Sequence, residues 1–139
     1  MVDKLICSLL YHNLLFKCLK MATIQTIEKH KKIRTDLVLD ITRLAILITE
    51  SKEFSVEIEL AGFVGKFGVI IHFQDSDKTI NLIDNWSCFS HPMKDRDWHE
   101  KHFPRDFKSI NKELELCKQT LNDLLIDKIN INELIQKVA

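Results

Sequence analysis

"FSVEIELAGFVGKFGVIIHF", residues 54–73, contains the pattern that decides the fold of this 139-residue chain. Apolar and polar residues alternate on both sides of a turn that contains Gly62 and Gly65. This is the pattern of two half-buried strands joined as an antiparallel hairpin. The residues expected on the inward face are Phe54, Val56, Ile58, Leu60, Phe67, Val69, Ile71 and Phe73.

The segment after the hairpin predicts a third short strand. "DSDK" has the composition of a turn, and "TINLI" (79–83) places Ile80 and Leu82 on the inward face. The three runs therefore predict a three-stranded antiparallel meander with one face on the core.

The outer face of this predicted sheet carries His72, which we expect to form a solvated cross-strand pair with Glu57 or Glu59. Ile70 and Ile83 fall on the same face. Two apolar residues there indicate partial cover by the N-terminal segment or by a second subunit.

A long helix is predicted before the sheet. Residues 22–49 contain neither Gly nor Pro, and apolar residues recur every three or four positions between Ile33 and Ile48. The second half, "DLVLDITRLAILIT" (36–49), is apolar over most of its circumference. We therefore expect that part to be covered on more than one side.

Another long helix is predicted after the sheet. Pro104 suits the first position of a helix, and apolar residues recur from Phe107 to Leu124 at spacings of three and four. "INELIQKVA" (131–139) predicts a short final helix. Since both long helices need a surface to cover, we expect residues 21–139 to form one α+β domain, a two-layer sandwich of the meander against both helices.

Composition excludes several classes of protein. Lys and Arg number 20, Asp and Glu also number 20, and 45% of the residues are apolar, so the chain is a folded domain without a global charge to attract nucleic acid or an anionic membrane. The four cysteines follow no disulfide spacing, which indicates reduced thiols in a cytoplasmic protein.

Residues 1–20, "MVDKLICSLLYHNLLFKCLK", allow two interpretations. Their apolar run is too short to span a membrane, and no cleavage site follows it. The segment is either an extension upstream of a natural start at Met21, or an amphipathic helix packed on the domain or on a partner. The mass of the N-terminal peptide, measured on protein made from the native gene, distinguishes the two start sites.

The irregular stretch before the second long helix, "CFSHPMKDRDWHEKHF" (88–103), contains one Cys and three His at short intervals. A Cys/His3 set is competent to bind zinc, and zinc is the one cofactor that the sequence suggests. The candidate ligands are Cys88, His91, His99 and His102. The seven-residue gap between the two pairs is shorter than in common zinc fingers, and "HEKH" is one residue short of the metalloprotease motif.

The same stretch and its flanks suggest a protein-binding surface. Aromatic residues and Arg are enriched among interface hot spots, and both tryptophans of the chain occur here. The candidate contact residues are Trp86, Phe89, Met93, Arg96, Trp98, Phe103 and Arg105. The alternative is that both tryptophans close one end of the sandwich.

Catalysis and nucleic-acid binding have weaker support. The chain contains no phosphate-binding glycine loop, dinucleotide motif or nucleophile elbow, so an enzyme is the less favoured class. The basic residues Lys29, Lys31, Lys32 and Arg34 are spread around a helix next to acidic residues and predict a solvated surface. We therefore favour a small protein that binds another protein or a second copy, as an inhibitor, immunity protein, chaperone or adaptor. The alternative is a zinc-binding protein or metal-dependent hydrolase that uses the Cys/His3 set, and a nucleic-acid-binding protein is a weaker alternative.

Elemental analysis of the purified, tag-free protein tests the metal hypothesis. If the Cys/His3 set binds zinc, we expect one zinc per chain, lost in Cys88→Ser or His99→Ala because each removes a ligand. A metal-free preparation would contradict the hypothesis.

Overall fold

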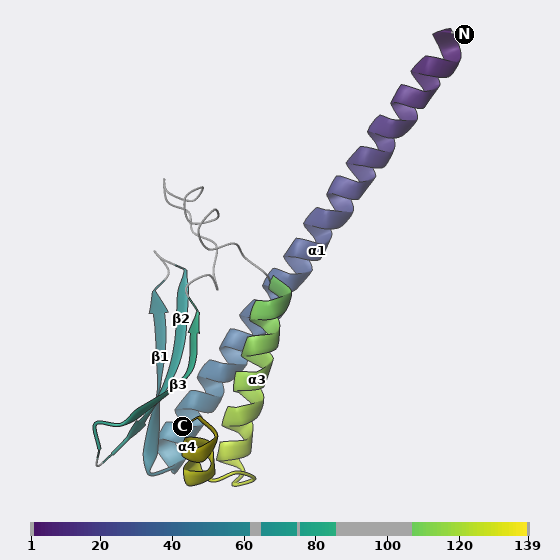
Figure 1. Cartoon of the computed structure of the whole chain (residues 1–139). Helices are drawn as coiled ribbons and strands as arrows, with labels where there is room; N and C mark the ends of the chain where they lie inside the picture. Colours follow the sequence, from purple (N-terminus) through teal and green to yellow (C-terminus); the bar gives the residue numbers. More distant parts are fainter. Residues whose placement is uncertain (1, 62–64, 75, 86–106, 139) are drawn as a thin grey trace.

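The computed structural model describes residues 2–61, 65–74, 76–85 and 107–138 (Figure 1). In chain order, the elements are α1 (Val2–Ser51), β1 (Phe54–Ala61), β2 (Lys66–Phe73), β3 (Thr79–Asn85), α3 (Phe107–Leu125) and α4 (Ile131–Val138). The predicted α+β class is confirmed, with a three-stranded antiparallel meander packed against two long helices. The predicted helix start at Pro104 lies outside the described residues.

The three strands form one antiparallel sheet in the order β1-β2-β3. The predicted hairpin is confirmed in its register, because Phe54 pairs with Phe73 and Ile58 pairs with Val69. The alternation of the sequence thus places one set of apolar side chains of β1 and β2 against the helices.

A β-bulge in the pairing of β2 with β3 changes which residues of β3 face inward. Val69 pairs with Ile83 and Ile71 pairs with Ile80, with a register shift between Val69 and Ile70. Ile80 and Ile83 are therefore both buried, whereas Leu82 is only partly buried. The prediction that Ile83 lies on the outer face was wrong, because an extra residue at a bulge reverses the alternation beyond it.

The outer face of the sheet is mostly polar. His72 Nε2 lies 2.5 Å from Glu57 Oε2, which confirms the predicted cross-strand pair. Lys66 Nζ lies 2.8 Å from Glu59 Oε2 and 3.4 Å from Asp84 Oδ1, and the hydrogen bond to Glu59 raises the pKa of Lys66. These charges suit a solvated face.

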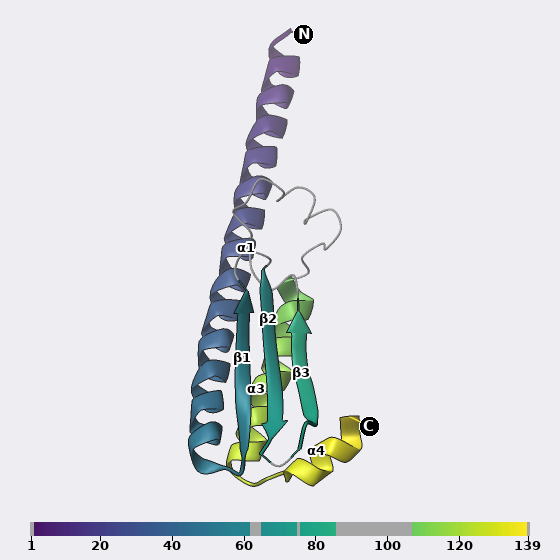
Figure 2. The same cartoon turned by 90° about the vertical axis from the view of Figure 1, so that its left-hand side faces the viewer.

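Helices α1 and α3 lie side by side across the inner face of the sheet (Figure 2). Their buried residues repeat every three or four positions, so each helix contributes one apolar face. The core consists mainly of Leu37, Ile41 and Ile48 of α1, Phe67, Val69 and Ile71 of β2, Ile80 and Ile83 of β3, and Ile110, Leu114, Cys117, Leu121 and Leu124 of α3.

Polar contacts hold α1 and α3 in register. Asn111 Nδ2 donates a hydrogen bond of 3.1 Å to the carbonyl oxygen of His30, and Lys118 Nζ lies 2.9 Å from Asp40 Oδ2. The hydrogen bond from Lys118 lowers the pKa of the Asp40 carboxyl. The contact at His30 marks the level at which α3 begins to accompany α1.

The helix α1 continues far beyond this level. Figures 1 and 2 show its N-terminal part projecting past the sheet and α3 as a single straight rod. We call residues 2–29 the arm and the remaining described residues the body. At 1.5 Å per residue the arm is roughly 40 Å long. The described side chains of the arm between Ser8 and Leu15 are exposed, so the arm is not packed on its own body as one interpretation of residues 1–20 expected.

The predicted final helix is α4, and its start has a clear local cause. Asn130 Oδ1 accepts a hydrogen bond of 2.8 Å from the Glu133 backbone N–H, and Glu133 Oε1 accepts one of 3.0 Å from Asn130 Nδ2. Before it, Asp127 adopts a φ of 57° and ends the turn after α3. An Asp tolerates this left-handed conformation better than most residues.

Replacing Leu121 by Ala tests the core. Leu121 is fully buried between α1 and the sheet, so we expect the free energy of unfolding to fall by about 2–5 kcal/mol. Leu116→Ala is the matched control on the same helix, because Leu116 is 69% exposed, and we expect a change within about 0.5 kcal/mol. Urea unfolding followed by circular dichroism measures both, and equal losses would contradict this packing.

Candidate functional site

The most unusual surface of the described residues is an uncovered apolar face along α1. Eight large apolar side chains on this helix are between 43% and 67% exposed. All of them except Leu9 lie on one side of the helix, and we call these seven the outer stripe. Its arm end consists of Leu10, Tyr11, Leu14 and Leu15, and its body end consists of Leu39, Ile46 and Leu47. Exposed apolar patches of this extent mark interaction sites more often than ordinary surface.

The two ends of the outer stripe lie on the same side of the helix. Leu10 and Ile46 are separated by 36 positions, as are Tyr11 and Leu47, and 36 residues make ten turns of an α-helix. The core residue Ile41 lies on the opposite side, since it is five positions before Ile46 and so about 140° away around the axis. The outer stripe therefore faces away from α3 and the sheet along the full length of α1.

Charged residues separate the two ends. Glu28, Lys29, Lys32 and Asp36 are exposed on the same side of α1, between the arm end and the body end. This middle section contains two acidic and two basic residues and has no net charge. This side of α1 is thus mainly apolar at both ends, with Arg43 within the body end, and polar but neutral at its centre.

The apolar circumference of residues 36–49 predicted cover on more than one side, but Leu39, Ile46 and Leu47 are exposed in the described structure. The prediction did not connect these residues with residues 10–15. The 36-residue spacing is the signal that could have placed both groups on one side of the helix, but it applies only if α1 is one unbroken helix.

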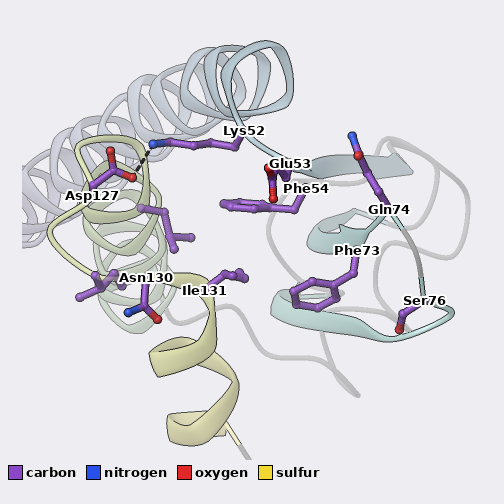
Figure 3. A pocket seen from close by; sticks show the side chains of 11 residues that line it. Lys52, Glu53, Phe54, Phe73, Gln74, Ser76, Asp127, Asn130 and Ile131 are labelled. Atoms are coloured by element: carbon purple, nitrogen blue, oxygen red, sulfur yellow. Dashed lines mark hydrogen bonds and ion pairs between the residues drawn. The ribbon is translucent and has the colours of Figure 1, made fainter.

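A second feature is an open pocket of about 610 Å³ at the end of the body opposite the arm (Figure 3). Its apolar lining consists of Phe54, Phe73, Leu124, Ile129 and Ile131. At its rim, Lys52 Nζ lies 2.5 Å from Asp127 Oδ1, and this ion pair connects the end of α1 to the turn after α3. The lining includes neither His nor Cys, and Ser76 lies in it without a His to activate its hydroxyl.

The described cysteine is unsuited to catalysis. Cys117 is 4% exposed in the core, and burial raises the pKa of its thiol to about 12. A thiol with this pKa remains protonated at neutral pH and is a poor nucleophile. Cys117 therefore acts as a small apolar core residue.

The predicted site residues lie outside the described part of the chain. This holds for the aromatic and Arg contact set from Trp86 to Arg105 and for the Cys/His3 set from Cys88 to His102. Within the described residues, no group of three His, Cys, Asp or Glu is arranged to hold a metal ion. Both sets remain predictions.

The basic residues at the base of the arm are not uniformly solvated. Arg34 is 8% exposed, and its guanidinium lies 5.9 Å from the centre of the Phe107 ring. The prediction of a solvated residue was wrong at Arg34, because the start of α3 covers it and the aromatic ring favours a cation there. Lys31 forms a 3.1 Å ion pair with Glu28.

Comparisons with known proteins give no relative. No protein-family model, curated protein or solved structure matches this chain. Among the helices that the structure describes, none is long and apolar enough to cross a membrane.

Thiol labelling tests the assignment of Cys117. In a variant with Cys7, Cys18 and Cys88 replaced by Ala, we expect Cys117 to resist a thiol reagent at pH 8 and to react fully in denaturant. Burial keeps the reagent away from the thiol, and it also disfavours the thiolate, which is the reactive form. Fast labelling of the folded variant would contradict the assignment.

Proposed function

We propose that this protein is a non-enzymatic protein-binding module whose contact surface is the outer stripe of α1. The observation that carries the proposal is the row of exposed apolar residues on a helix that extends beyond its own body. Inhibitors, immunity proteins, chaperones and adaptors all act by contacting another protein, and exposed apolar patches mark such contact sites.

The free energy available from this surface is substantial. A large apolar side chain that is half exposed still presents roughly 100 Å² to water, and burial yields about 25 cal/mol per Å². Each residue of the outer stripe therefore contributes up to about 2.5 kcal/mol on binding. Such anchors, three and four positions apart, are the usual means by which one helix binds a groove or another helix.

The arm itself has a physical need for a partner. Helices in water owe most of their stability to tertiary packing of one face. The described side chains from Ser8 to Leu15 are exposed, so the body does not supply that packing for them. A bound protein that covers Leu10 and Leu14 would stabilise the helix and hide its apolar surface at the same time.

The predicted aromatic set around Trp86 and Trp98 is compatible with this proposal as a second contact area. The zinc hypothesis is independent of it, because the predicted ligands belong to a different segment. Nucleic-acid binding is less favoured, since Arg34 is buried and Lys31 is paired with Glu28.

The double variant Leu10→Glu/Leu14→Glu tests the proposal. We expect at least a tenfold loss of complex formation by the tagged full-length chain in its native cell, because two apolar anchors become charged. Cross-linking followed by mass analysis of the tagged species measures the complex, whether it contains another protein or a second copy.

The matched control is Leu9→Glu/Asn13→Glu. It adds the same charge at the same spacing, but Leu9 and Asn13 lie about 100° around the helix axis from Leu10 and Leu14, outside the outer stripe. We expect this control to retain the complex, and the unfolding midpoint of the body to be the same in both variants. Equal complex formation by the two variants would refute the proposal.

A further inference from the structure

We infer that the outer stripe binds a second copy of this chain, with the two α1 helices antiparallel. This inference rests on the proposed function, because it names the partner of the same surface. In the arrangement, the arm end of each copy lies against the body end of the other.

The positions of the two apolar ends define the register. Placing Leu10 and Tyr11 of one copy beside Ile46 and Leu47 of the partner puts the two-fold axis between Glu28 and Lys29. Since both ends lie on one side of the helix, both contacts form at once. Each body then accompanies the arm of the other copy, and the two bodies sit at opposite ends of the helix pair.

Charge complementarity favours the antiparallel direction over the parallel one. In the register set by the two apolar ends, Glu28 of one copy faces Lys29 of the other, and Lys17 faces Asp40. The antiparallel pair therefore brings opposite charges together at these positions. A parallel pair would bring like charges together, which disfavours that alternative.

The area is sufficient for a stable dimer. Seven residues of the outer stripe, at roughly 100 Å² each, would remove about 700 Å² per copy from water, or about 1,400 Å² in total. This is within the range of specific protein–protein interfaces. The neutral middle section adds contact area without net charge repulsion.

A second copy also explains the exposed body end. A partner that bound only the arm would leave Leu39, Ile46 and Leu47 in water. In the antiparallel pair, the arm of the second copy covers this end, with its Leu10 and Tyr11 beside Ile46 and Leu47. One symmetric contact thus accounts for both ends of the outer stripe.

Light scattering on the purified full-length chain tests the oligomeric state. We expect twice the chain mass of 16.3 kDa. Leu10→Glu/Leu14→Glu and Ile46→Glu/Leu47→Glu should each raise the dimer dissociation constant at least tenfold, and Leu9→Glu/Asn13→Glu should leave it unchanged.

Cross-linking with single cysteines tests the direction of the helices. In the variant with Cys7, Cys18 and Cys88 replaced by Ala, Leu14→Cys and Arg43→Cys are made separately. In the proposed pair, position 14 of one copy faces position 43 of the other. A short bismaleimide should therefore join the chains only when the two proteins are mixed. A product from Leu14→Cys alone, with none in the mixture, would overturn the antiparallel direction.

The outcomes separate this inference from the proposed function. A monomeric wild-type chain at 100 μM would overturn the dimer. If that monomer captures a different protein through Leu10 and Leu14, the proposed function still holds with another partner. If it captures nothing through them, both fail.

Discussion

The burial of the inner face of β2 is the contact on which the rest of this structure depends. Phe67, Val69 and Ile71 are fully buried beneath both α1 and α3. Because β2 is the central strand, its side chains meet both helices and both neighbouring strands. Both helices bury apolar residues in the same core as this surface, and they also pack against each other.

This constraint also explains why α1 has two parts with different surroundings. The sheet and α3 can accompany only the segment of α1 after about His30, because α3 begins there and the strands are short. The helix nevertheless continues to Val2 as one element. The same helix therefore supplies the core with one face and presents an apolar face to solvent on the other side.

The predictable part of the fold came from local periodicity. Alternation in residues 54–73 was sufficient for the hairpin and its register, and the three-four spacing of Ile110 to Leu124 was sufficient for α3. The bulge opposite Ile70 escaped prediction, because it depends on how β3 pairs and not on the composition of β3. The burial of Arg34 escaped for a similar reason, since Phe107 is distant in sequence.

The candidate site, too, was predictable from the sequence only in part. The sequence by itself determined that residues 36–49 are apolar on several sides and that residues 1–20 form an apolar segment, because both follow from residue types and their order. Only the tertiary structure decided that they belong to one straight helix and that their apolar residues share one side. That result depends on the helix remaining unbroken for ten turns and on the body covering only the opposite face, and neither condition is encoded within a local window of residues.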